Sequence, residues 1–230
     1  MTDMLSANQF FFLTLTLVAF SIGRLLNKKF KSAIVNPILI GAVLIIAVLS
    51  VLDIPNETYQ SGCRLLSFLI TPATICLSIS LYSQFQTIKK HIPAVLTGLT
   101  FGTLSCLAVI YLMCRLFGFD SAMTATLLPK SITTAIGVSV SEELGGIAAV
   151  TSACIVLTGI MTNIAGPFLI KLFRIKSPIA QGVSLGTAGH VIGTARAAEI
   201  GELVEAVSSF SLTVTGILTT VLLSFAAEYI

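Results

Sequence analysis

Charged residues are scarce in this chain. They make up 10% of its 230 residues, whereas hydrophobic residues make up 55% and the mean hydropathy is +1.00. Soluble globular domains carry about 25% charged residues. The polar gaps between the apolar runs are short, so no separate soluble domain is expected, and the net charge of +3 does not indicate a nucleic-acid partner. Because several runs approach the ~20 apolar residues that cross a bilayer, the sequence predicts an all-α polytopic membrane protein.

Signatures of enzymes and metal sites are also missing. The chain has two histidines, His91 and His190, and no G-x-S-x-G, H-E-x-x-H or P-loop motif. Its five cysteines form no C-x-x-C pair, which favours buried apolar thiols over metal ligands or disulfides. We therefore expect no enzyme activity, no catalytic residue, no metal and no cofactor. An intramembrane serine protease that uses His190 is an alternative, but no serine is marked as its nucleophile.

The apolar runs predict six full crossings. No cleavable signal peptide is expected, because Met1–Asn8 has no basic region and the first apolar run lacks a small-residue cleavage site. The first 116 residues hold four of the crossings, and residues 117–230 hold two more together with two stretches of mixed polarity, 121–146 and 178–202. The predicted crossings are residues 10–26, 36–52, 63–85, 92–116, 147–172 and 203–227.

The positions of the cations indicate how the two mixed stretches are threaded. Lysine and arginine concentrate in cytoplasmic loops. If residues 121–146 dip into the membrane and return to the same side, all nine cations of three loops lie inside and both termini lie outside. Two fully crossing broken helices, giving eight crossings, remain an alternative. The nine cations are Arg24, Lys28, Lys29, Lys31, Lys89, Lys90, Lys171, Arg174 and Lys176.

A weak internal repeat with an offset of 57 residues links the two mixed stretches. It places Glu142 on Glu199 and Thr158-Gly159-Ile160 on Thr215-Gly216-Ile217. Each unit of the repeat is a hairpin followed by one crossing, so successive units are expected to have opposite orientations. Paired interrupted segments in inverted repeats point to the substrate site of a transporter.

The first mixed stretch, LLPKSITTAIGVSVSEELGG, predicts an anion site. A helix that starts near Pro129 presents free backbone N–H groups, the hydroxyls of Ser131, Thr133 and Thr134, and the ammonium group of Lys130. A lysine inside a membrane is costly, so a functional role is the default interpretation. The alternative is that Lys130 extends to the outer interface from a shallow hairpin.

The second mixed stretch, LGTAGHVIGTARAAEIGE, combines glycines with polar residues. Its glycines permit close backbone approach or unwinding. His190 is either a proton-coupling group or a donor to a backbone carbonyl. Arg196 either contacts the substrate or pairs with Glu199 at i, i+3 spacing.

The two stretches, together with TPATICLSISLY at residues 71–82, resemble the LrgB/CidB family of bacterial membrane proteins over nearly the whole chain. The combination of P-K-S-x-T-T with G-T-A-x-H-x-I-G-T-A is specific to that family, which often has serine at the position of Gly189. The resemblance implies a single domain over residues 1–230 and candidate substrate-binding residues at the motif positions. These are Pro72, Ala73, Thr74, Pro129, Lys130, Ser131, Thr133, Thr134, Gly186, Thr187, His190, Gly193, Thr194 and Arg196.

The resemblance implies two functions. Family members are discussed as holin-like or antiholin-like modulators of murein hydrolase activity and cell lysis, acting with a small membrane partner of the LrgA/CidA type. Relatives in plastids exchange glycolate and glycerate, and the family is linked to elevator-type carriers. The sequence favours a secondary transporter of small monocarboxylates of the glycolate, glycerate or pyruvate class, with possible proton coupling, in the bacterial inner membrane. The alternative is the antiholin-like modulator; in either case a homo-oligomer is expected.

Overall fold

A computed structural model describes residues 9–30 and 37–227 of the chain, and the regular elements in them are all helices. The chain forms two compact units, residues 1–76 and 77–230. Among the described residues, four helices are long and apolar enough to cross a membrane: Phe10–Phe30, Ile92–Leu116, Ala148–Leu172 and Glu202–Ala226. This agrees with an all-α membrane protein. The six predicted crossings are not confirmed, because the apolar helix over Pro37–Val51 has only 15 residues and Arg64–Ser83 is not among the four.

The first unit is built from helices α2 (Gln9–Phe30), α3 (Pro37–Val51), α4 (Asn56–Gly62) and the start of α5 (Arg64–Ser83). Phe12 is fully buried and packs edge-on against Tyr59, with ring centroids 5.7 Å apart. The Tyr59 hydroxyl lies 2.9 Å from Thr16 Oγ1. These contacts join α2 to α4.

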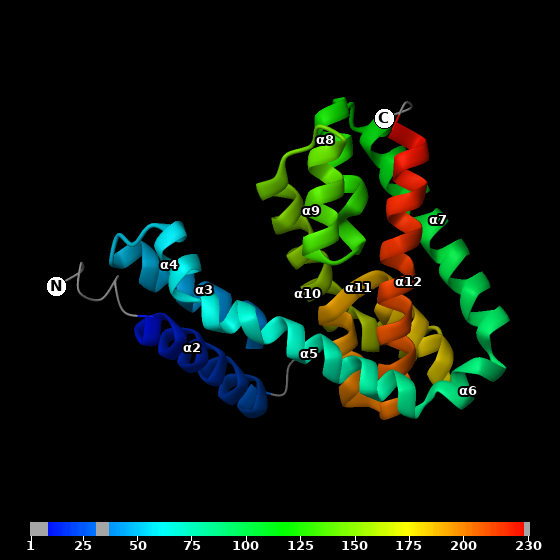
Figure 1. Ribbon diagram of the computed structural model, residues 1–230, viewed down its shortest axis with the longest axis horizontal. Helices are drawn as coiled ribbons and strands as arrows, with labels where there is room; N and C mark the ends of the chain where they lie inside the picture. Colours follow the sequence, from blue (N-terminus) through cyan, green and yellow to red (C-terminus); the bar gives the residue numbers. More distant parts are fainter. Residues whose placement is uncertain (1–8, 31–36, 228–230) are drawn as a thin grey trace. The chain divides into compact units, whose positions relative to one another are not determined.

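The second unit contains the two stretches of mixed polarity (Figure 1). In chain order its elements are α6 (Phe85–Lys90), α7 (Ile92–Leu116), α8 (Ser121–Leu127), the 3₁₀ turn η1 (Leu128–Ser131), α9 (Thr134–Glu143), α10 (Ala148–Leu172), α11 (Pro178–Ile200) and α12 (Glu202–Ala226).

The first mixed stretch forms a hairpin, residues 121–147, in which α9 runs back along α8 and η1. The backbone is extended at Ile132 and Thr133, which ends η1 and starts α9. The returning chain passes close enough to α8 that a Cβ on Gly146 would lie 2.9 Å from the Thr126 nitrogen. The Ile147 N–H donates to Thr126 Oγ1 over 2.8 Å, and Thr151 Oγ1 donates to the Thr126 carbonyl over 3.1 Å. The chain therefore leaves this hairpin beside the helix that began it.

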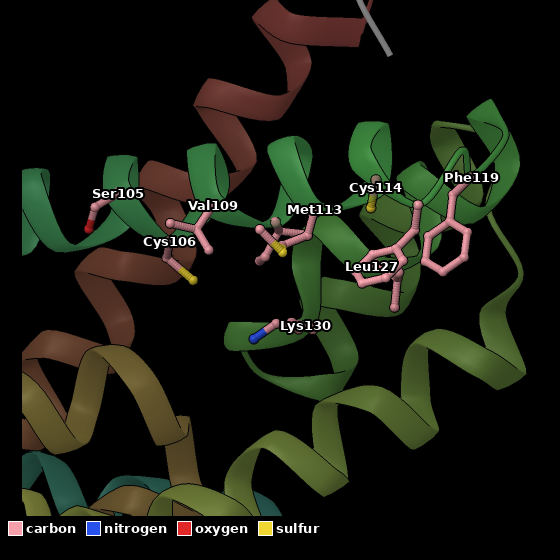
Figure 2. A pocket seen from close by; sticks show the side chains of 10 residues that line it. Ser105, Cys106, Val109, Met113, Cys114, Phe119, Leu127 and Lys130 are labelled. Atoms are coloured by element: carbon pink, nitrogen blue, oxygen red, sulfur yellow. The ribbon is translucent and has the colours of Figure 1, made fainter.

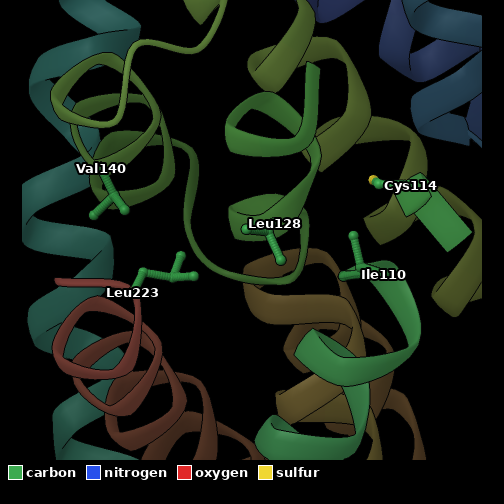
Figure 3. Packing of buried hydrophobic residues seen from close by; sticks show 5 residues of the cluster. All are labelled: Ile110, Cys114, Leu128, Val140 and Leu223. Carbon is green, nitrogen blue, oxygen red and sulfur yellow. The ribbon is translucent and has the colours of Figure 1, made fainter. Parts of the chain in front are cut away.

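Apolar side chains hold the first hairpin against the long helices of the second unit. Figure 3 shows Leu128 and Val140 of the hairpin with Ile110 and Cys114 of α7 and Leu223 of α12, all buried. Burying such side chains is the main favourable contribution to this packing.

The Thr126 side chain is expected to stabilise the first hairpin. It is fully buried, and valine there would leave the Ile147 N–H without its acceptor. A buried donor that loses its partner costs about 1–3 kcal/mol. We expect Thr126→Val to lower the free energy of unfolding by that amount in detergent, and Thr126→Ser to change it little. Equal stability of the valine variant and the wild type would contradict this hydrogen-bond assignment.

The second mixed stretch, α11, also folds back on itself. Its helix is interrupted at His190, which has φ 42° and ψ −132°. A Cβ on Gly193 would lie 2.2 Å from the Leu185 carbonyl oxygen. Residues eight apart lie about 12 Å apart along a continuous helix, so this contact requires a reversal of the chain at His190.

α12 packs along both halves of this second hairpin. A Cβ on Gly182 would lie 2.7 Å from the Val204 carbonyl oxygen, and one on Gly186 would lie 2.4 Å from that of Ser208. Moving four residues along α11, from Gly182 to Gly186, moves the contact four residues forward along α12, from Val204 to Ser208. α12 therefore runs in the same direction as the first half of α11. Thr194, in the second half, has its hydroxyl 2.8 Å from Ser208 Oγ.

The two hairpins lie along opposite halves of α10, and both tips lie near its middle. A Cβ on Gly137 would lie 2.6 Å from Ile155 Cδ1, and His190 Nε2 lies 3.0 Å from the Ile155 carbonyl oxygen. A Cβ on Gly166 would lie 2.7 Å from Leu185 Cδ2, so α10 runs opposite to the first half of α11 and therefore opposite to α12. Thr133 and His190, at the two tips, are 57 residues apart, which equals the offset found in the sequence.

Candidate functional site

A cavity of about 810 Å³ lies next to the tip of the first hairpin. One wall comes from α7, at Gly98, Gly102 and Cys106, and the opposite walls come from α10 and the first half of α11. Its lining is mostly apolar. The polar residues that line it are Lys130, Ser131, Thr158, Thr162, Ser184 and Thr187.

Lys130 is the only charged residue that the described part of the chain contributes to this lining. It is half-buried in η1, and its Nζ lies 3.5 Å from Ser131 Oγ, which in turn lies 3.3 Å from Cys106 Sγ. Among the described residues, no carboxylate lies within salt-bridge distance of Lys130. A partly desolvated ammonium group without a counter-ion attracts an anion, because the anion replaces the water that the cation has lost.

Thr187 adds a second polar group without a partner. Its hydroxyl oxygen is buried, lines the same cavity and makes no hydrogen bond within the described part of the chain. The neighbouring hydroxyls are already engaged, because Thr158 donates to the Cys154 carbonyl and Thr162 to the Thr158 carbonyl. Lys130 and Thr187 are therefore the groups of this cavity that are best able to bind a ligand.

An apolar groove of about 620 Å³ adjoins the cavity and shares Lys130 and Cys106 with it. In Figure 2 the side chains of Cys106 and Met113 extend from α7 toward the level of Lys130. Lys130 thus lies where an apolar surface meets the polar part of the cavity.

His190 is held in the packing of the second hairpin. It is buried, its Nε2 lies 3.0 Å from the Ile155 carbonyl oxygen, and its ring fills the space beside Gly159. The backbone-bonded alternative is thus the one that the structure shows, and a role in proton coupling stays a prediction. Thr194 donates to the His190 carbonyl, and Gly186 and Gly193 permit close backbone contacts, so these residues shape the hairpin.

Gly189 differs from the residue that the family resemblance leads us to expect. A Cβ at this position would lie 2.5 Å from Cγ2 and 2.7 Å from Cβ of Thr162. Because Thr162 also donates to the Ala188 carbonyl, its side chain occupies the space that a serine at position 189 would need. The Thr162 side chain therefore leaves room only for glycine at position 189.

Arg196 lies outside the cavity that contains Lys130. It pairs with Glu199 one turn later and lines a different cavity, at the end of α10. The ion pair that the i, i+3 spacing suggested is therefore present. The structure does not bring Arg196 and Lys130 into one site.

The remaining motif residues divide between the two units. Pro129 is buried, Thr133 half-buried and Thr134 exposed at the first tip, and none of the three lines the cavity. Pro72 is exposed in α5, and the side chains of Ala73 and Thr74 lie outside what the structure describes. The contribution of α7 was not predicted. Its signal is the spacing of Gly98, Gly102 and Cys106, which places three small residues on one helix face.

Comparison with known proteins assigns the chain to a family. The model of the LrgB-like family matches residues 16–229, and the match therefore includes both hairpins and α7. The chain belongs to the LrgB-like family. It is 36% identical to a protein of Bacillus mycoides strain KBAB4 and 35% identical to one of Bacillus cereus strain B4264, in each case over 96% of both chains. Both relatives are named antiholin-like protein LrgB. No solved structure matches the chain.

Family membership identifies the chain as an LrgB-like membrane protein and explains why its motifs are found together. The geometry adds which motif residues share a cavity: Lys130, Ser131 and Thr187 do, whereas His190 and Thr194 pack within the second hairpin. A cavity with one unpaired cation and a mostly apolar lining suits a small organic anion.

Proposed function

We propose that this protein is an antiholin-like modulator of murein hydrolase activity and cell lysis in a bacterial membrane. The observation that carries the proposal is the match over 96% of both chains to relatives with that name. Matches of this extent include the hairpins and the long helices together.

Deletion of the gene tests this role directly. If the protein restrains lysis, its loss raises the murein hydrolase activity of cell extracts and speeds detergent-induced autolysis. Complementation with the wild-type gene restores both, and so does the variant Lys89→Gln, whose altered side chain is exposed on α6. Unchanged hydrolase activity and autolysis in the deletion strain would refute the proposed role.

We further propose that the molecular activity behind this role is transport of small monocarboxylates of the glycolate, glycerate or pyruvate class. The supporting observation is the cavity in which, among the described residues, Lys130 has no carboxylate partner and the Thr187 hydroxyl has no hydrogen-bond partner. A helical pore would need polar groups free to face water. The hydroxyls of Ser208, Ser211 and Thr215 on α12 are instead buried, which is typical of tight helix packing. Transport of a metabolic acid would influence lysis indirectly, by changing the metabolism of the cell.

The transport proposal includes a membrane arrangement. The opposite directions of α10 and α12, each preceded by a hairpin, support an inverted repeat in which one hairpin enters from each face of the cytoplasmic membrane. In this arrangement six segments cross, the termini lie outside and the hairpins move as in an elevator-type carrier. Irregular backbone at the two tips is tolerated at membrane depth because it is buried in protein.

Partners follow from the same proposals. A small membrane protein of the LrgA/CidA type and further copies of this chain are the expected protein partners, and a small carboxylate, with or without a coupled proton, is the expected substrate. The apolar side chains exposed on α7, such as Phe101 and Leu112, are available to lipid or to such a partner.

A further inference from the structure

The cavity at the end of α10 is lined by an unusual concentration of cations. It has a volume of about 610 Å³ and lies apart from Lys130. Four of its lining residues are cationic, and among the described residues the carboxylate that pairs with one of them is that of Glu199, which contacts Arg196. The cations are Lys171, Arg174, Lys176 and Arg196.

We propose that this basic cavity binds a phosphate group, and we favour that of an anionic phospholipid headgroup. The lining also includes Pro167, Ile170, Ile175 and Ile200, so apolar surface for an acyl chain lies directly beside the charges. Lys171 lies in the last turn of α10, and Arg174 and Lys176 lie in the loop that follows it. The charge distribution predicts that this loop is cytoplasmic, and on that side anionic lipids meet basic pockets between helices.

The backbone at Arg174 supports a functional role for its side chain. Arg174 follows the C-cap of α10 and has φ 54°, a left-handed conformation that glycine adopts at much lower cost. The Ile175 N–H donates to the Ile170 carbonyl over 2.9 Å, so the conformation belongs to a regular helix-terminating turn. An arginine at a position that favours glycine indicates that its guanidinium group contributes something other than stability.

Arg196 supplies a second sign of a missing ligand. Its Nε is buried and has no hydrogen-bond partner among the described residues, although NH1 is paired with Glu199. Gln181 holds the loop that carries the other cations, because its Nε2 donates to the Ile175 carbonyl over 2.7 Å. Gln181, which is neutral, therefore fixes the loop without using any of the cations. The Nε–H of Arg196 stays available to donate to an acceptor oxygen of a ligand.

The test is lipid binding to the purified full chain by native mass spectrometry in a non-ionic detergent. Dioleoylphosphatidylglycerol is compared with zwitterionic dioleoylphosphatidylcholine, and sodium phosphate is titrated separately by calorimetry. We expect preferential binding of phosphatidylglycerol. Arg174→Gly should weaken it roughly fivefold, and Arg174→Gly with Lys176→Gln roughly 25-fold, since each cation near an anionic surface contributes about 1 kcal/mol.

Arg174→Gly is informative because glycine suits the backbone at this position. Its unfolding midpoint should equal or exceed that of the wild type, so lost binding would not reflect misfolding. The matched control is Lys89→Gln with Lys90→Gln, which removes two exposed cations that line none of the three described cavities. Equal weakening by this control, or equal binding of both lipids without phosphate binding, would overturn the proposal. Cation-dependent binding of phosphate alone would assign the site to a free phosphate compound.

Discussion

Gly193→Ala is expected to prevent the second hairpin from closing. The new Cβ would lie 2.2 Å from the Leu185 carbonyl oxygen, which is backbone and cannot move aside without opening the reversal at His190. Overpacking of a closed core costs about 1–3 kcal/mol, and a backbone clash lies at or above the upper end of that range. We expect the free energy of unfolding in detergent to fall by roughly 3 kcal/mol or more, with a broadened size-exclusion profile.

Gly98→Ala is the matched control for this substitution. A Cβ at Gly98 would lie 3.6 Å from Val183 Cγ1, which is ordinary van der Waals contact. Within α7 alanine favours the helix by about 1 kcal/mol relative to glycine. The control should therefore unfold at the wild-type temperature or above it. If Gly193→Ala were as stable as Gly98→Ala, the second hairpin would not have the reversal described at His190.

Lys130→Ala is expected to abolish most of the proposed carboxylate transport without unfolding the protein. Lys130 has no carboxylate partner among the described residues, so alanine removes the cation and leaves no buried charge unpaired. A buried charged contact to a ligand is worth about 2–5 kcal/mol, which corresponds to a fall of roughly two orders of magnitude in carboxylate uptake. The unfolding midpoint should stay the same or rise.

Two substitutions separate the charge of Lys130 from other effects. Lys130→Arg keeps a cation at the cavity and should keep part of the uptake. Lys89→Ala removes an exposed lysine that lines none of the described cavities and should keep all of it. Wild-type uptake rates in Lys130→Ala would mean that the anion binds elsewhere.

Both hairpins could be predicted from the sequence because their residues are unsuited to a plain membrane helix. Proline, clustered hydroxyls and closely spaced glycines mark places where a helix ends or the backbone approaches another segment. Thr133 and His190, at the two tips, are 57 residues apart, and the inverted repeat itself stays a prediction. The neighbours of each hairpin could not be predicted, because they depend on packing between segments distant in the chain.

The functional residues were harder to predict than the fold. Sequence motifs placed Lys130, His190 and Arg196 in one group, but the structure places Lys130 in a cavity, His190 in the packing against α10, and Arg196 at the end of α10. A polar residue in an apolar chain is conspicuous whether it binds a ligand or satisfies a backbone carbonyl. Only the partners of each side chain distinguish these roles, and sequence spacing does not report them.

A carrier and a pore, the two molecular activities that could lie behind an antiholin-like role, make different demands on the membrane. A carrier exposes its cavity to one side at a time and saturates, because each cycle moves a bound anion. A lytic pore lets large solutes through without saturation. The buried hydroxyls of α12 and the mostly apolar cavity around Lys130 favour the first behaviour.

Uptake of labelled glycolate, glycerate and pyruvate into proteoliposomes that also contain a large entrapped dye tests most directly the claim that a carrier activity lies behind the antiholin-like role. The account predicts saturable uptake of at least one of these acids, competition among related acids, and retention of the dye. Release of the dye, or uptake that rises linearly with concentration, would contradict a carrier with its anion site at Lys130 and would leave a pore as the molecular activity.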